Sequence, residues 1–316
     1  MFSRYDIDNL SVELNFIRDN MEKVVRLCSI LEFINSDAML SELMSLKGGT
    51  AINLLVMPIP RLSVDIDLDF TENCDRLSML RKRKNIADKL HAFLFRNGYR
   101  LMPRSKSPFS VDSWVFQYTN VLGNLDNIKI EINYSLRCHL FPMEFRPILL
   151  SPFSNVEVRS LALVELYASK IKALFERGAA RDLFDVHNMI TAHIIDDAQQ
   201  SLLRKGIVFY KTVGGSAELP VEFSLKSIEN IQFKQIRSTL LPVLKKGTFY
   251  DLDRVKQEVC DYLQDLMKLS ENELLFIERF NVNEYHPELL FEDENIVERI
   301  QNHPMAIWKT QKSMNK

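Results

Sequence analysis

The chain has 316 residues, of which 46% are hydrophobic and 26% are charged, and its formal net charge is −2. This composition is ordinary for a globular protein and excludes a disordered, collagenous or low-complexity chain. No segment reaches the roughly 18 uncharged apolar residues that a membrane-spanning helix needs, and no signal peptide begins the chain, so we expect a soluble, cytoplasmic protein without a membrane partner.

Helical spacing covers residues 20–46, with a break near residue 36, and leads into the triplet Gly48-Gly49-Thr50. Two glycines let backbone amides approach a phosphate without a Cβ in the way, and a following helix would add its N-terminal N–H groups. Thr50 adds a hydroxyl group. Such a triplet by itself is more often a plain turn.

A strand of alternating character follows at residues 63–70, with four apolar side chains on one face and Ser63, Asp65, Asp67 and Asp69 on the other. Carboxylates this close repel one another, and a divalent cation is the usual remedy. Mg²⁺ takes one or two carboxylates together with substrate phosphates, and an Asp-x-Asp pair presents two side by side. A solvated strand face is the alternative. The preceding glycines favour Asp65 and Asp67 as metal ligands, with Asp69 as a bystander.

The next segment is strongly basic: it begins at Arg76, ends at Lys106, and contains ten Lys or Arg but a single acid, Asp88. Such a segment suits a polyanion lying next to the acidic strand, because phosphate contacts depend on Lys and Arg. A solvated helix face is an equally good interpretation, and both stay open. Within the segment, residues 79–96 have helical spacing.

Further strands are expected at residues 99–102, 113–119 and 127–134. The last of these alternates strictly and places Glu131 on its polar face, together with Lys129. Glu131 is therefore a candidate third carboxylate for a metal, although an exposed Glu on an edge strand is the somewhat better interpretation of the pattern alone.

A helix is expected over residues 161–176, with Ser160 as its N-cap. Lys170 projects from the centre of an apolar face of this helix. Lysines are rarely buried without a partner, so this one could direct its ammonium at a triphosphate. The alternative is a side chain that reaches past its neighbours to solvent.

Gly178 ends that helix and Asp182 begins the next, with Asp185 three residues further on the same face. Negative charge is favoured at a helix N-terminus for structural reasons alone. Capping is therefore a serious alternative to a functional role for Asp182 and a weaker one for Asp185.

The remaining residues are mostly amphipathic helix, for example over 255–267 and 271–280. We predict two domains, an α/β domain over residues 1–155 and a helical domain over residues 156–316. The fold class is α+β: a mixed β-sheet flanked by helices, followed by a mostly helical C-terminal domain.

Four stretches carry a family resemblance: residues 47–54, 61–67, 168–177 and 181–185. They read Lys-Gly-Gly-Thr-Ala-x-Asn-Leu, Arg-x-Ser-x-Asp-Ile-Asp, Ala-Ser-Lys-Ile-Lys-Ala-Leu-Phe-Glu-Arg and Arg-Asp-Leu-Phe-Asp. In this form the sequence resembles the AbiEii/AbiGii toxin branch of the nucleotidyltransferase superfamily, which includes the MenT toxins.

The resemblance implies a metal-dependent nucleotidyltransferase fold and activity, in which a nucleoside monophosphate moves from an NTP to an acceptor hydroxyl. Asp65 and Asp67, with Glu131 as a tentative third ligand, would then hold Mg²⁺ or Mn²⁺. The other implied roles fall to six positions that contact the nucleotide or assist catalysis: Gly48, Gly49 and Thr50 as a phosphate cradle, Arg61 and Ser63 near the triphosphate, and Lys170 as its counter-charge. Either Asp182 or Asp185 would orient Lys170 or help the acceptor lose its proton.

The family also implies a type IV toxin–antitoxin pair, a cognate antitoxin, a role in phage defence and transfer to the 3′ end of tRNA. The basic residues 76–106 are then where an acceptor stem would bind. Two alternatives remain: an enzyme whose acceptor is a protein or a small molecule, and a non-catalytic relative that binds nucleotide or RNA. A kinase is disfavoured, because neither a P-loop nor the kinase loops are present.

Overall fold

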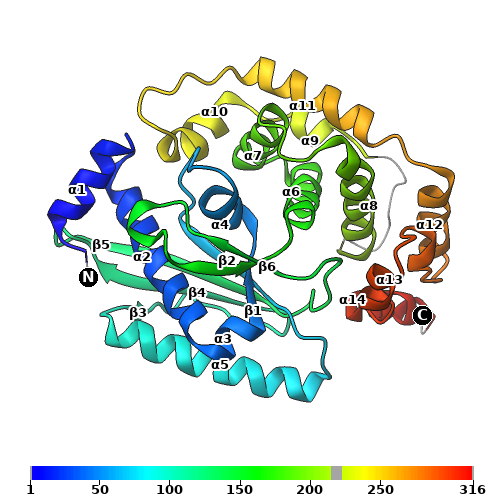
Figure 1. Cartoon of the computed structure of the whole chain (residues 1–316), viewed down its shortest axis with the longest axis horizontal. Coiled ribbons are helices and arrows are strands. Elements are labelled where there is room, and N and C mark those ends of the chain that lie inside the picture. Colours follow the sequence, from blue (N-terminus) through cyan, green and yellow to red (C-terminus); the bar gives the residue numbers. More distant parts are fainter. Residues whose placement is uncertain (1, 215–222, 315–316) are drawn as a thin grey trace. The chain divides into compact units, whose positions relative to one another are not determined.

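The structure, a computed structural model, describes residues 2–214 and 223–314 (Figure 1). The chain divides into two compact units. Unit 1 comprises Met1–Arg137, Met143–Ser160 and Pro242–Thr248, and unit 2 comprises Cys138–Pro142, Leu161–Leu241 and Phe249–Lys316.

Unit 1 is built on a seven-stranded mixed sheet with the strand order β3-β4-β5-β2-β1-β7-β6. Its strands are β1 (Met44–Leu46), β2 (Asp65–Phe70), β3 (Arg100–Leu101), β4 (Val111–Thr119), β5 (Leu125–Asn133), β6 (Glu144–Pro147) and β7 (Glu157–Ser160). Its helices are α1 (Arg4–Glu13), α2 (Arg18–Ser36), α3 (Ala38–Leu43), α4 (Gly48–Ala51), η1 (Ile52–Val56), α5 (Arg76–Arg96) and η2 (Ser151–Phe153). The predicted α+β class, a mixed sheet flanked by helices, is confirmed.

Strand β1 corrects the expected helix over residues 20–46. Helix α3 ends at Leu43, and the three following residues form a fully buried strand between β2 and β7. Their side chains are short or apolar, and pairing with two neighbours satisfies their backbone groups better than another turn of helix would. Only Lys47 lies between the end of this strand and Gly48.

The central strands of the sheet have one apolar and one polar face. Ile66 on β2 pairs in register with Ile130 on β5, which in turn pairs with Trp114 on β4. All three are buried, and burying one such side chain contributes about 1.5–3 kcal/mol. The opposite face carries Asp65 and Asp67, because successive strand residues point to opposite sides.

Helices α2 and α5 cover the apolar face (Figure 1). From α5, the ring of His91 lies 4.6 Å from that of Trp114. From α2, the guanidinium of Arg26 lies 4.2 Å from the ring centre of Tyr118, which shares the face of Trp114. The Asp-bearing face of β2 is thus the one that these two helices leave uncovered.

Unit 2 is helical, as expected for the C-terminal part of the chain. Its longer helices are α6 (Leu163–Arg177), α7 (Ala180–Thr191), α8 (Asp197–Gly214), α11 (Leu252–Leu266), α12 (Glu271–Asn281) and α14 (Pro304–Met314). Shorter ones are α9 (Lys226–Glu229), α10 (Phe233–Gln235), η3 (Ile236–Leu240), η5 (Pro287–Leu289) and α13 (Glu294–Ile300), and η4 (Leu241–Val243) begins at the last unit 2 residue before the chain enters unit 1.

The expected N-cap of α6 is wrong. Ser160 is the last residue of β7, where it is buried and paired with Leu46, and the helix begins two residues later after Ala162, whose side chain makes no capping bond. Gly178 does end α6: it adopts a left-handed φ of +53°, and a Cβ there would lie 2.2 Å from the carbonyl oxygen of Ser227. Only glycine satisfies both conditions.

A buried carboxylate ties segment 138–142 to α6 and α8. Glu165 accepts hydrogen bonds from the Leu140 amide at 3.1 Å and from the Tyr210 hydroxyl, and its Oε1 lies 3.1 Å from Nδ1 of His139. A buried carboxylate is tolerated because several donors satisfy it. Lys170 lies on the same helix as this anchored residue. Within residues 2–214 and 223–314, no helix is long and apolar enough to cross a membrane.

Candidate active site

Gly48 lies directly against the acidic strand. Its φ is +67°, and a Cβ at this position would lie 2.7 Å from Oδ2 of Asp67. Both the backbone conformation and the space therefore require glycine. At Gly49 a Cβ would lie 2.6 Å from Nη2 of Arg61 and 3.3 Å from Oγ of Ser63. The two glycines hence bring the backbone amides that begin α4 next to a carboxylate and a guanidinium.

Thr50 is fully buried, and its hydroxyl lies 2.9 Å from Oγ of Ser63 and 2.5 Å from the carbonyl oxygen of Asp65. These contacts fix the start of β2 relative to α4. The geometry favours a positioning role for Thr50, whereas the predicted direct contact with phosphate is not tested by the structure.

Arg61 is 2% exposed and donates a hydrogen bond from Nη1 to the carbonyl oxygen of Leu62 at 3.0 Å. Its backbone forms an isolated bridge with Leu244. Arg61 and Ser63 were expected beside the triphosphate because they precede the carboxylates in sequence. They do lie beside Gly49, and their contact with a nucleotide stays a prediction.

The register of β2 and β5 assembles a charged cluster on the polar face. Asp65 pairs with Lys129, and Asp67 pairs with Glu131. The ammonium of Lys129 lies 2.5 Å from Oε2 of Glu131. Burial lowers the pKa of Lys129, but the charges of Glu131, Asp65 and Asp67 outweigh burial and hold this pKa above its usual value. The lysine is thus an ammonium among three carboxylates.

Asp69 is engaged elsewhere. The Lys47 ammonium lies 2.5 Å from its Oδ1, and the Asp69 side chain is 3% exposed. A carboxylate that is buried and neutralised by a lysine has little reason to bind a metal. This contact accounts physically for the interpretation of Asp69 as a bystander.

The residues on the polar face suit a divalent cation of the Mg²⁺ type. Among the residues that the structure describes, no three His, Cys, Asp or Glu side chains form a group that could hold a metal ion by themselves. Mg²⁺ needs no such group, since it commonly uses one or two carboxylates and takes its other ligands from water and substrate phosphates. Asp65 and Asp67 supply two hard oxygen donors beside the Gly48 cradle, so they fit this donor set. Glu131 as a third ligand stays a prediction, because its Oε2 is bonded to Lys129.

The second group of predicted site residues lies in unit 2. The ammonium of Lys170 lies 3.0 Å from Oδ1 of Asp182 and 3.0 Å from Oδ2 of Asp185. Lys170 is 7% exposed, so it does not reach out to solvent past its apolar neighbours. Both aspartates therefore hold the lysine, and a capping role does not account for Asp182.

A second cation, Arg177, shares Asp182, with Nε 2.6 Å from Oδ2. Burial raises the pKa of Asp182, but the positive charges of Lys170 and Arg177 outweigh burial and hold this pKa below its usual value. Burial raises the pKa of Tyr250, and the negative charge of Asp185 raises it further. Asp182 is thus kept in its charged form.

Arg177 and Lys129 were given no role by the sequence pattern. Arg177 is the last residue of α6, and the only sequence signal for it is its place in the resembling stretch 168–177. Its partner Asp182 follows after the turn at Gly178. Lys129 could have been found from the sequence only if the pairing of β5 with β2 had been known.

Helix α5 covers the apolar face of the sheet and therefore lies on the opposite side from Asp65 and Asp67. The binding of a polyanion by its basic residues stays a prediction. Some of its charge is structural, since Arg83 donates to Asp112 at 2.6 and 3.1 Å. The following cations remain exposed: Arg76, Arg81, Lys84, Lys89, Arg96, Arg100, Arg104 and Lys106.

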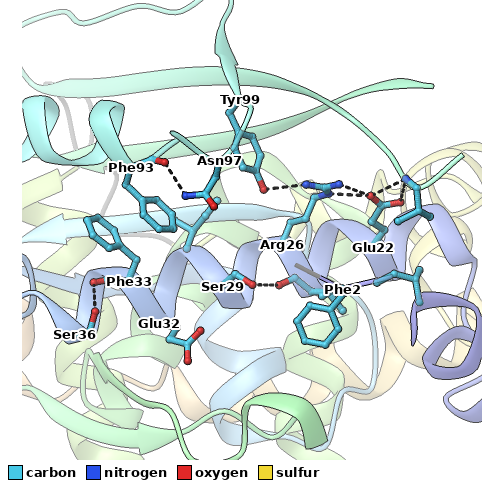
Figure 2. Close-up of a pocket in the computed structure, with 14 residues that line it drawn as sticks. Phe2, Glu22, Arg26, Ser29, Glu32, Phe33, Ser36, Phe93, Asn97 and Tyr99 are labelled. Atoms are coloured by element: carbon cyan, nitrogen blue, oxygen red, sulfur yellow. Dashed lines mark hydrogen bonds and ion pairs between the residues drawn. The ribbon is translucent and has the colours of Figure 1, made fainter. Parts of the chain in front are cut away.

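A pocket of about 510 Å³ opens between α2 and α5, on the side away from the acidic strand (Figure 2). Figure 2 shows Arg26 bonded to Glu22 and Tyr99, and the stacked rings of Phe33 and Phe93, whose centres are 3.9 Å apart. None of the predicted site residues lines this pocket.

Comparison with protein families identifies the family of this chain. The family described as "Nucleotidyl transferase AbiEii toxin, Type IV TA system" matches residues 30–265, well over half of the chain. The chain is an AbiEii nucleotidyltransferase. The matched range includes the glycine pair, the acidic strand and the lysine helix of this AbiEii enzyme. No curated protein sequence matches the chain.

Among solved structures, the AbiEii chain is similar to MenT4, a nucleotidyltransferase toxin from Mycobacterium tuberculosis H37Rv. The TM-score is 0.65 with 16% sequence identity, and the match covers 97% of this chain and 99% of the other. At this identity the likeness establishes the fold. Together with the family match, it confirms the predicted nucleotidyltransferase class and the predicted toxin family.

Proposed function

We propose that this AbiEii nucleotidyltransferase is the toxin of a type IV toxin–antitoxin pair that transfers a nucleoside monophosphate from an NTP to the 3′ end of tRNA. The observation that carries the proposal is the contact between Gly48 and Asp67, in which a Cβ would lie 2.7 Å from the carboxylate oxygen. Backbone donors for a phosphate and a carboxylate for a metal thereby meet at one point. A nucleotide with its divalent ion requires both.

In the proposed reaction, the 3′ hydroxyl oxygen of the acceptor forms a bond to the α-phosphorus. The bond from that phosphorus to the oxygen bridging to the β-phosphate breaks, and pyrophosphate leaves with the electron pair. The hydroxyl proton passes to solvent. Chemistry of this kind depends mostly on positioning and on neutralising charge.

The residues of this chain have the following proposed roles. The amides of Gly48 and Gly49 bind phosphate oxygens, Thr50 holds β2 in place, and Arg61 and Ser63 lie against the triphosphate. Lys170 neutralises the triphosphate, and Asp182 and Asp185 orient Lys170, in keeping with the two 3.0 Å ion pairs.

Asp65 and Asp67 would hold Mg²⁺ or Mn²⁺, which supplies Lewis-acid stabilisation of the phosphate charge when bound. Glu131 is the candidate third ligand. Because these side chains offer only oxygen donors, a hard cation suits them better than zinc or copper.

For the acceptor, the exposed cations of residues 76–106 support RNA binding through phosphate contacts. Because α5 lies on the other face of the sheet, an acceptor stem would have to reach around the edge of the sheet to contact the cations of this helix. We place the reaction in the cytoplasm, where tRNA and NTPs are available, with a cognate antitoxin that restrains it and phage defence as its physiological setting.

The same location of α5 favours a second candidate, a protein or small-molecule acceptor, because the basic residues of α5 do not share the sheet face of Asp65 and Asp67. The non-catalytic alternative would be expected to lack part of the site. The chain retains Asp65, Asp67 and Lys170, and Lys170 has both of its aspartate partners.

The test incubates the protein with Mg²⁺ or Mn²⁺, bulk tRNA and each of the four NTPs labelled at the α-phosphate. The Asp65→Ala, Asp67→Ala variant serves as the inactive form, and an Asp88→Ala, Glu298→Ala variant, which removes two exposed carboxylates elsewhere, serves as the matched control. The proposal is supported if the wild type and the control variant label the RNA and the inactive variant does not. Label on the protein itself supports the second candidate, and label nowhere supports a non-catalytic relative.

A further inference from the structure

The polar face of β2 and β5 carries a lysine where a metal site would be expected to carry only acids. Lys129 pairs in register with Asp65, and its neighbour Glu131 pairs with Asp67. Adjacent strands are about 4.8 Å apart, so side chains at paired positions on one face are immediate neighbours. One positive charge thus stands among three negative ones.

The ammonium of Lys129 is held within this cluster and is not simply extended into water. Its Nζ lies 2.5 Å from Oε2 of Glu131, and both side chains are less than half exposed. Asp65 is the residue paired with Lys129 across the two strands, and Asp67 is paired with Glu131, so all four side chains share one face. An ammonium next to carboxylates satisfies the same electrostatic requirement that a divalent cation does.

We propose that Lys129 is an internal counter-ion of the metal site: its ammonium balances the Asp65, Asp67 and Glu131 cluster in the empty enzyme and weakens the binding of a divalent cation when no nucleotide is present. The inference rests on the proposed role of Asp65 and Asp67 as metal ligands. A nucleotide brings negative phosphates that offset the lysine charge, so the cation binds well only together with an NTP.

The first experiment measures Mn²⁺ binding to the full-length protein without nucleotide, by calorimetry and by the paramagnetic signal of free Mn²⁺. Lys129→Met removes the charge while keeping the length of the side chain, and Lys129→Arg keeps the charge. Lys245→Met, an exposed lysine of the same unit, controls for the change in net charge. We expect about tenfold tighter binding for Lys129→Met, or about 1.4 kcal/mol, and wild-type affinity for the other two.

The second experiment needs no metal and covers the case in which Lys129→Met is too unstable to titrate. Thermal unfolding in a chelating buffer compares the wild type, Lys129→Met, Asp67→Asn and the double variant. We expect the Lys129→Met change to lower the melting temperature because it leaves the carboxylates uncompensated, and Asp67→Asn to recover part of the loss in that background. Additive effects of the two substitutions would overturn the proposal.

The outcomes separate this inference from the proposed function. If Asp67→Asn abolishes Mn²⁺ binding but Lys129→Met binds no more tightly than the wild type, the counter-ion role is wrong and the metal site stands. If Asp67→Asn binds Mn²⁺ as the wild type does, the metal site itself is misassigned, and the counter-ion role is lost with it.

Discussion

The Lys47 ammonium lies 2.5 Å from the Asp69 carboxylate, and this ion pair distinguishes Asp69 from Asp67, which lies two residues earlier on the same face of β2. Two aspartates in one alternating pattern therefore have different surroundings. One is buried against a lysine, and the other lies against the backbone of Gly48.

Asp69→Asn should mainly reduce the stability of the protein, whereas Asp67→Asn should mainly reduce its activity. Asp69→Asn leaves the partly exposed Lys47 without its partner and should lower the free energy of unfolding by about 2 kcal/mol, somewhat less than for a fully buried pair. Asp67→Asn should change it by less than about 1 kcal/mol but reduce nucleotidyl transfer about a hundredfold or more. Chemical denaturation and the labelled-NTP assay measure the two quantities, and equal losses of activity would contradict the bystander role of Asp69.

Gly48→Ala should abolish activity through a steric effect on Asp67. The added methyl group would lie 2.7 Å from the carboxylate oxygen and would also strain a backbone with φ of +67°. Gly98→Ala is the matched control, because Gly98 has φ of +79° but nothing within 4 Å of a Cβ. Both variants should lose about 1 kcal/mol of stability from backbone strain, and only Gly48→Ala should lose nucleotide binding and transfer. Similar activities of the two variants would show that the contact with Asp67 is unimportant.

The contribution of Asp182 to the stability of the protein should change with pH in the acid range. Its pKa is lowered in the folded state, so the stabilisation is present above the unfolded value of about 3.9 and is lost as the pH falls through the lowered folded value. Unfolding measured between about pH 2.5 and about pH 7 should show stability declining below about pH 4. Asp182→Asn should be less stable at pH 7 and should show a shallower decline, and an unchanged slope would argue against the ion pairs with Lys170 and Arg177.

Lys170→Met and Lys170→Arg should both impair transfer, since only a lysine fits between two aspartates at 3.0 Å. The methionine variant leaves two buried carboxylates without their ammonium and should lose about 3 kcal/mol of stability. Lys172→Met, on the same helix but paired with Glu176 near the surface, is the matched control and should stay within about 1 kcal/mol of the wild type. Transfer by Lys170→Arg at the wild-type rate would contradict the proposed role.

The basic segment can be tested by its salt dependence. Replacing Lys84, Arg96 and Arg100 by Ala should weaken tRNA binding about tenfold and reduce the slope of log affinity against log salt by about 2 to 3, if each cation contacts a phosphate. Lys234, Arg237 and Arg299, exposed cations of unit 2, form the control triple variant. Equal effects of the two triple variants would favour the interpretation of a solvated helix face.

The local features of this protein can be predicted from its sequence alone. The alternation of residues 63–70 predicts β2, the glycine pair predicts the turn into α4, and helical spacing places Lys170 on an apolar face. These features follow from neighbouring residues, because side-chain direction repeats every two residues in a strand and every 3.6 in a helix. Whether Lys170 is buried or reaches solvent stays open in the sequence, and the structure shows that it is buried. The motif residues also identified the family, which the comparison confirms.

The contacts between residues far apart in the sequence become known only from the folded structure. The pairing of β2 with β5 places Lys129 beside Asp65, β1 forms a strand because it is enclosed between β2 and β7, and α5 lies on the sheet face opposite the aspartates. No local pattern encodes a strand register or the face on which a helix packs, since both depend on burying apolar surface that distant segments supply.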